Sequence, residues 1–220
     1  MHLGGRRLND HDLSALSIED LAAGISRCRL CRDLSDARRL PHEPRPIFRL
    51  SPTAKLFICS QAPGVRAHAS GIPFSDPSGI RLRAWMGVTE AEFYDAAKIA
   101  IVPMGFCFPG HDKNGGDLPP RPECAKHWRA HVFESLRQTP ELILLVGSHA
   151  QRWHLGAGVQ PTLAGTLKNW HALSDVTQRQ CYFPLPHPSW RNTGWLKKNP
   201  WFEEEVVPAL RQKVRLLIAG

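Results

Sequence analysis

Four short apolar runs, separated by stretches with helical spacing, dominate the hydrophobic pattern of this chain. The runs cover residues 55–60 (KLFICS), 98–103 (KIAIVP), 141–147 (ELILLVG) and 180–185 (QCYFPL). Each is almost continuously apolar, as expected for a strand that is covered on both faces. The pattern therefore predicts four buried strands.

Apolar residues at helical spacing lie before, between and after these runs. They predict helices over residues 10–26, 78–86, 89–97, 123–138, 148–155 and 201–217. Ser17, followed by Asp20, suits the start of the first helix, and Thr89 suits the start of the third. Alternating strands and helices predict an α/β fold: a three-layer α/β/α sandwich with a central four-stranded parallel sheet. With no internal repeat and no low-complexity tract, we expect one domain over residues 1–220.

Composition and charge narrow the class of protein. The chain has 220 residues, 42% of them hydrophobic, which is typical of a globular domain. The 28 Lys and Arg exceed the 20 Asp and Glu by 28 − 20 = 8, which favours a polyanionic partner such as nucleic acid. No run approaches the roughly 18 apolar residues of a membrane span, and the N-terminal segment is too polar for a secretory signal. We expect a cytoplasmic location, where cysteines serve as metal ligands or reduced thiols rather than disulfides.

The loops that follow the four predicted strands carry unusual chemistry. Their sequences are SQAPG (60–64), MGFCFPG (104–110), GSHA (147–150) and PLPHPS (184–189). In parallel sheets, ligands bind outside the carboxyl ends of the strands. Prolines fix the direction of these loops. We therefore expect a shaped binding site at this edge of the sheet.

Three of these segments together resemble a known family. SQAPG after the first strand, PFSDPSG at 73–79 and HPS at 187–189 are similar, in this order, to motifs of the uracil-DNA glycosylase superfamily. The resemblance extends from about Cys28 to the last predicted helix. It implies a monofunctional DNA glycosylase that flips a deaminated base, uracil foremost, out of DNA and hydrolyses its N-glycosidic bond in base excision repair. We expect DNA as the partner of a monomer that has no membrane contact.

The resemblance also assigns roles to residues around the expected site. Asp76 would orient water and stabilise positive charge on the sugar, although Asp directly before a helix is also a common N-cap. His187 would stabilise negative charge on the departing base. Phe74 would stack on the base, although an isolated Phe is more often a core residue. The expected substrate-binding residues are Ser60, Gln61, Ala62, Pro63, Gly64, Phe74, Met104, Gly105 and Ser148.

Basic and aromatic residues follow His187 at short intervals. This composition suits contacts with phosphates and a wedge into the base stack, and it equally suits a solvated surface loop. With the proposed site alongside, we expect DNA contacts from Ser189, Trp190, Arg191, Asn192, Lys197 and Lys198.

Four of the six cysteines have a spacing typical of a ligand set. Cys28 and Cys31 form a C-x2-C pair, and Cys107 and Cys124 follow much later in the chain. Four thiolates suit either a [4Fe-4S] cluster or structural zinc, and ligand type alone does not choose between them. The pattern is similar to that of the iron–sulfur-containing, family 4/5-like branch of the superfamily. The resemblance therefore favours a [4Fe-4S] cluster, with segment 10–35 as part of its binding site. Cys59 and Cys181, within predicted strands, are expected to be core residues.

Two departures from the family pattern leave the substrate open. Pro103 stands where members of this branch have an asparagine that reads the uracil edge, and the first motif has Gln61 and Ala62 where some members have an acid. Gln61, or the backbone near Met104 and Gly105, would then hold the base. Hypoxanthine or xanthine excision is an alternative, as is an inactive member that only binds nucleic acid. An unrelated nucleotide enzyme is a weaker alternative because the phosphate-binding Lys-Ser/Thr signature is missing.

Overall fold

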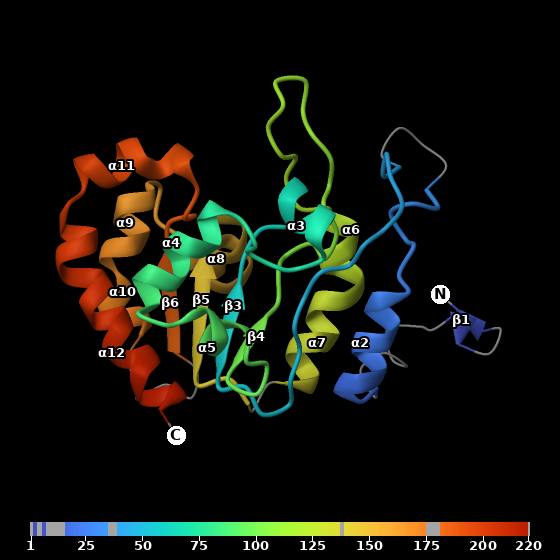
Figure 1. The fold of residues 1–220 in the computed structure, drawn as a ribbon, viewed down its shortest axis with the longest axis horizontal. Coiled ribbons are helices and arrows are strands. Elements are labelled where there is room, and N and C mark those ends of the chain that lie inside the picture. The colour runs from blue at the N-terminus through green and yellow to red at the C-terminus, as the bar shows by residue number, and fades with distance from the viewer. Residues whose placement is uncertain are drawn as a thin grey trace.

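Four parallel strands form the centre of the molecule (Figure 1). The computed structural model describes residues 16–34, 39–136, 139–174 and 181–219, and the backbone of 2–3 and 6–7. The sheet has the order β4-β3-β5-β6, which confirms the predicted four-stranded parallel sheet. Its strands are β3 (Leu56–Cys59), β4 (Ile99–Ile101), β5 (Leu142–Val146) and β6 (Cys181–Leu185).

Strict alternation of side chains along the strands builds two cores, one on each face of the sheet. Leu56 lies opposite Ile99 and Leu142 in neighbouring strands, and all three side chains join one core. Phe57 points to the opposite face and joins the other core. Because both faces are buried, the strands need apolar residues at successive positions, which explains their continuous apolar runs. Cys59 and Cys181 are buried, as predicted.

Helices cover both faces, which confirms the three-layer α/β architecture of a single domain. The core on the first face is closed by α4 (Pro77–Met86), α5 (Glu90–Tyr94), α9 (Leu163–Lys168), α10 (Trp170–Leu173), α11 (Thr193–Lys198) and α12 (Val207–Ile218). The core on the second face is closed by α2 (Ile18–Ser26), α7 (Ala130–Ser135) and α8 (Ser148–Leu155). Figure 1 shows α9, α10, α11 and α12 on one side of the strands, and α2 and α7 on the other.

The predicted helix starts agree with the structure where it describes them. Ser17 caps α2, since its hydroxyl accepts a hydrogen bond of 3.1 Å from the N–H of Asp20. Residues 10–15 of the predicted first helix lie outside the described residues. Thr89 and Glu92 form a reciprocal capping box at α5. This helix ends at Tyr94, earlier than predicted, because the Asp95 side chain accepts the N–H of Ala97 and so competes with helical hydrogen bonds.

Two predicted helices contain π-helical turns. The first comprises α6 (Pro122–Cys124), a π-helical turn at Ala125–Arg129, and α7. The second begins with a π-helical turn at Phe202–Val206 and continues as α12. The sequence analysis missed the short helices α3 (Val65–Ser70), α9, α10 and α11, and the 3-10 turns at Gly156–Gly158 and Trp190–Asn192.

Two further observations complete the description. His2–Leu3 (β1) and Arg6–Arg7 (β2) pair as a small antiparallel sheet. Among the helices of the described ranges, none has the length and apolarity that crossing a membrane requires.

Candidate active site and cysteine cavity

A cavity of about 580 Å³ opens at the carboxyl edge of the sheet. The loops after β3, β5 and β6 line it, together with segment 73–78 and a hairpin at residues 109–118. The predicted convergence of strand-end loops at this edge is thus present. Of the predicted residues, the cavity wall contains Ser60, Gln61, Ala62, Pro63, Gly64, Phe74, Asp76, Ser148, His187, Ser189, Trp190, Arg191 and Asn192.

Backbone hydrogen bonds hold the first motif in place from behind. The N–H of Met104 donates to the carbonyl of Ser60 at 2.8 Å, and the N–H of Gly105 donates to the carbonyl of Gln61 at 3.0 Å. Met104 is buried, and neither Met104 nor Gly105 is part of the cavity wall. Their N–H groups, which were expected to hold a base edge, are therefore already engaged in positioning Ser60 and Gln61.

Gly147 lies beside both Gln61 and His187 at the end of β5. Its φ is +85°, a conformation that glycine adopts without strain. A Cβ at this position would lie 3.4 Å from Cβ of His187 and 3.5 Å from Nε2 of Gln61, which are ordinary contact distances. The backbone conformation therefore favours glycine here, and the two predicted site residues both lie next to it.

Three side chains fix the loop that carries His187. The buried Gln151 of α8 donates to the carbonyl of Leu185 at 2.8 Å. Asn192 donates to the carbonyl of His187 itself at 2.7 Å, and Arg81 of α4 donates to the carbonyl of Ser189 at 3.0 Å. Sequence reasoning missed Gln151 and Arg81. For Gln151 a signal was available, because it is a glutamine at a core-facing position of the predicted helix 148–155.

Asp76 both caps α4 and lines the cavity. Its Oδ1 accepts the N–H of Gly79 and its Oδ2 accepts the hydroxyl of Ser78, each at 3.2 Å. The N-cap interpretation is therefore confirmed. The carboxylate also acts on His187 electrostatically, so the cap does not remove Asp76 from the cavity.

His187 is neutral at pH 7 in this environment. Loss of water around the ring lowers its pKa to about 4, because burial disfavours the charged imidazolium. The negative charge of Asp76 opposes this effect, whereas the positive charges of Arg191 and His149 add to it. A neutral imidazole offers one N–H donor and one acceptor nitrogen.

Phe74 lies at the cavity wall in an unusual backbone conformation. Its φ is +55°, which is costly for a residue with a Cβ. The ring packs edge-on against Phe93, with 5.9 Å between the ring centroids, and the hydroxyl of Tyr94 donates to the carbonyl of Pro73 at 2.9 Å. One part of Phe74 therefore packs on the core while another part faces the cavity. The residue thus lies both in the core and at the expected site.

The rim beyond His187 is exposed and basic. Trp190 is 77% exposed, and the guanidinium of Arg191 lies 5.9 Å from the centroid of its ring. Lys197 and Lys198 are exposed in the last turn of α11 and lie outside the cavity wall.

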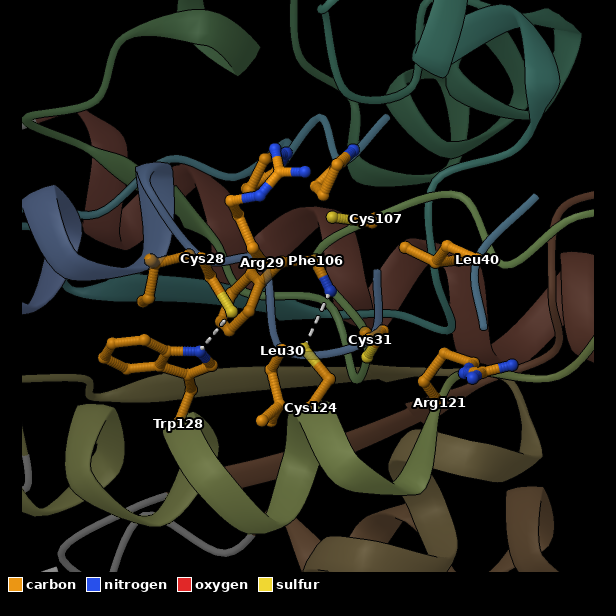
Figure 2. Close-up of a pocket in the computed structure, with 14 residues that line it drawn as sticks. Cys28, Arg29, Leu30, Cys31, Leu40, Phe106, Cys107, Arg121, Cys124 and Trp128 are labelled. Carbon is orange, nitrogen blue, oxygen red and sulfur yellow. Dashed lines mark hydrogen bonds between the residues drawn. The ribbon is translucent and has the colours of Figure 1, made fainter. Parts of the chain in front are cut away.

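The four cysteines predicted as ligands line a second cavity, behind the first motif (Figure 2). Cys28 and Cys31 come from the segment after α2, Cys107 from the loop after β4, and Cys124 from α6. Two N–H groups donate to sulfur: Nε1 of Trp128 to Sγ of Cys28 at 3.2 Å, and the backbone of Phe106 to Sγ of Cys124 at 3.3 Å. The fold thus brings together all four residues of the predicted set.

Burial disfavours the charged form of these thiols. Burial raises the pKa of Cys31 and Cys124, and raises that of Cys107 to about 12. Arg121 lines the same cavity, and its Nε forms an ion pair with Oε2 of Glu123 at 3.8 Å. Across the described ranges, however, no three or more His, Cys, Asp or Glu side chains are arranged so that they could hold a metal ion.

Sequence reasoning missed the hairpin at 109–118, which contributes His111 and Asp117 to the cavity wall. Nδ1 of His111 lies 3.3 Å from Oδ1 of Asp117. The Asn-Gly-Gly sequence at 114–116 was a turn signal, but nothing local indicated that the hairpin reaches the cavity.

Comparison with protein families agrees with the fold. The family model described as "Uracil DNA glycosylase superfamily" matches residues 48–211, which is most of the chain. The chain belongs to the uracil DNA glycosylase superfamily. The match contains SQAPG, PFSDPSG and HPS. The matched range begins after Cys28 and Cys31. The match therefore does not test whether the chain belongs to the iron–sulfur branch. Members of this superfamily are generally DNA glycosylases, which are hydrolases that act on DNA.

Gly79→Ala is expected to displace Phe74. A Cβ at Gly79 would lie 1.8 Å from the carbonyl oxygen of Phe74, so one of the two segments must move. We expect the free energy of unfolding to fall by about 1–3 kcal/mol, as for other overpacked sites, in urea denaturation. Gly194→Ala is the control: nothing lies within 4 Å of its Cβ, and we expect a gain of about 0.4–1 kcal/mol. Equal stabilities of the two variants would contradict the close contact.

NMR titration of His187 is expected to give a pKa of about 4. Asp76→Asn should lower this pKa further, and Arg191→Gln should raise it, because the two native charges act on the imidazole in opposite directions. Since the folded pKa lies below the unfolded value of about 6.5, the unfolded state binds the proton first. Stability should therefore fall as the pH drops from about 6.5 towards 4. A folded pKa at or above the unfolded value would contradict this environment.

Proposed function

We propose that this chain is a monofunctional DNA glycosylase that flips a deaminated base, uracil foremost, out of DNA and hydrolyses its N-glycosidic bond in base excision repair. One observation carries the proposal: Gln61, Phe74, Asp76 and neutral His187 surround a single cavity at the carboxyl edge of the sheet. Membership of the glycosylase superfamily supports the same reaction.

Each of these side chains suits one step. The ring of Phe74 stacks on the flipped base, and the amide of Gln61 offers a donor and an acceptor to its edge. As the bond between C1′ and the base breaks, its electron pair leaves with the base. The N–H of neutral His187 stabilises the resulting negative charge without a competing proton transfer. The carboxylate of Asp76 stabilises the positive charge on the sugar and orients the water that adds to C1′.

The rim provides sequence-independent binding. The exposed Trp190 suits a wedge into the base stack at the position that the flipped nucleotide leaves. Arg191, Lys197 and Lys198 are available for contacts with phosphates, whereas the Asn192 side chain is engaged with the carbonyl of His187.

The cysteine cavity is proposed to hold a [4Fe-4S] cluster, which serves as a structural cross-link. The spacing of the cysteines, which resembles that of the iron–sulfur branch, favours this cluster over zinc, and all four cysteines line one cavity. The N–H donors to Cys28 and Cys124 and the guanidinium of Arg121, which lines the same cavity, would stabilise the negative charge of the ligands.

A base-excision panel tests the reaction. Single- and double-stranded oligonucleotides bearing uracil, hypoxanthine or xanthine are incubated with the protein, and abasic product is detected by alkaline strand cleavage. We expect excision of at least one base, and His187→Ala should slow it by about 10²–10³-fold, since it removes the donor to the departing base. His171→Ala, an exposed histidine on α10, should leave the rate unchanged. Binding of all these oligonucleotides without abasic product would contradict the proposal and favour an inactive binding protein.

Metal analysis of the purified protein tests the cluster. We expect a brown protein with broad visible absorbance and about four iron atoms per chain. Cys124→Ser should lose this iron because it removes one ligand, whereas Cys59→Ala, at a core cysteine in β3, should retain it. A colourless protein with stoichiometric zinc would contradict the cluster.

A further inference from the structure

Internal hydrogen bonds hold the hairpin at residues 109–118 together. It is the yellow-green loop that rises beyond the carboxyl edge of the sheet in Figure 1. Backbone hydrogen bonds join Leu118 to Gly110 at 2.9 Å and Asp112 to Gly116 at 2.7 Å. The Asp112 carboxylate also accepts the N–H groups of Asn114 and Gly116. These bonds stabilise the turn that carries Asp117.

Asp117 is the hairpin residue that brings a carboxylate to the first motif. Its Oδ2 lies 3.0 Å from the position that a Cβ on Gly64 would occupy, and its Oδ1 lies 3.3 Å from Nδ1 of His111. It shares the cavity wall with Asp76 and His187. The side chain is 49% exposed, so water in the cavity has access to it.

The two carboxylates of the cavity are held differently. Both oxygens of Asp76 already accept hydrogen bonds from the start of α4. Asp117 instead faces His111 with one oxygen and the glycine of the first motif with the other. Burial raises the pKa of Asp117, and the charges of Asp76 and Asp112 raise it further against the opposing effect of His111 and Arg191. A carboxylate with a raised pKa is a better proton acceptor.

We propose that Asp117 is a second catalytic residue and acts as the general base for the attacking water. This inference rests on the proposed function. The water oxygen forms a bond to C1′ of the flipped nucleotide. The N-glycosidic bond breaks, its electron pair leaves with the base, and the water proton passes to a carboxylate oxygen of Asp117. Asp76 then faces the positive charge on the sugar, and His111 orients the Asp117 carboxylate.

Single-turnover excision tests this assignment. The substrate is the oligonucleotide from which the wild-type protein releases a base, and affinity is measured with the same oligonucleotide carrying a hydrolysis-resistant 2′-fluorinated sugar. Asp117→Asn should slow excision about 100-fold or more and leave this affinity unchanged, because it removes the base and not a DNA contact. Glu141→Gln, an exposed residue directly before β5 at the opposite edge of the sheet, removes an equal charge and should leave both quantities unchanged.

The outcomes separate this inference from the proposed function. Excision by Asp117→Asn at the wild-type rate overturns the role of Asp117 alone. A wild-type protein that releases none of the three bases overturns both proposals. His111→Gln provides a second measurement: it retains the carboxylate, so it should slow excision less than Asp117→Asn does, and a larger effect would overturn the assignment of Asp117 as the base.

Discussion

Two backbone hydrogen bonds, from Met104 to Ser60 and from Gly105 to Gln61, connect the two cavities of this molecule. The loop after β3 forms part of the wall of the cavity at the carboxyl edge of the sheet, and the loop after β4 continues to Cys107 in the cysteine cavity. Breaking either bond would leave a buried donor or acceptor without a partner, which costs about 1–3 kcal/mol. A displacement of the cysteine segment is therefore transmitted to Gln61, and the position of Gln61 depends on how that segment is held.

A buried arginine holds the same connection from the other side. Nη1 of Arg129 donates to the carbonyls of Val102 and Pro103 at 2.9 and 3.0 Å, directly before Met104. Its guanidinium lies 4.8 Å from the ring centroids of both Phe133 and Trp153, a cation–π arrangement. Its Nη2 lies 2.7 Å from Nε2 of His154, whose pKa is lowered to about 2 by burial and by this charge, so the histidine accepts the hydrogen bond. Carbonyls, aromatic rings and a neutral imidazole thus stabilise the cation, and the strand end is fixed by groups from both neighbouring helices.

Much of this arrangement follows from sequence, and the rest depends on distant contacts. The strands were predictable because burial on both faces requires continuous apolar runs such as LFIC at Leu56–Cys59. The caps of α2 and α5 were predictable because their partners are three residues away. The roles of Met104 and Gly105 were not, because sequence does not indicate which carbonyl a loop N–H will find. Asp117 was missed for a related reason: it reaches the cavity only through the packing of its hairpin against Gly64.

The proline at position 103 bears on which bases the proposed reaction accepts. Pro103 lines the cavity and offers no side-chain hydrogen bond. Gln61 is then the amide available to the base edge, and an amide presents a donor and an acceptor side by side. Uracil, hypoxanthine and xanthine each present a ring N–H next to a carbonyl, so this amide complements all three. A cavity of about 580 Å³ has room for a purine as well as a pyrimidine. Thymine and guanine present the same pair, so Gln61 alone does not separate a deaminated base from these normal bases. That selection has to come from the other contacts of the cavity wall, Phe74 among them.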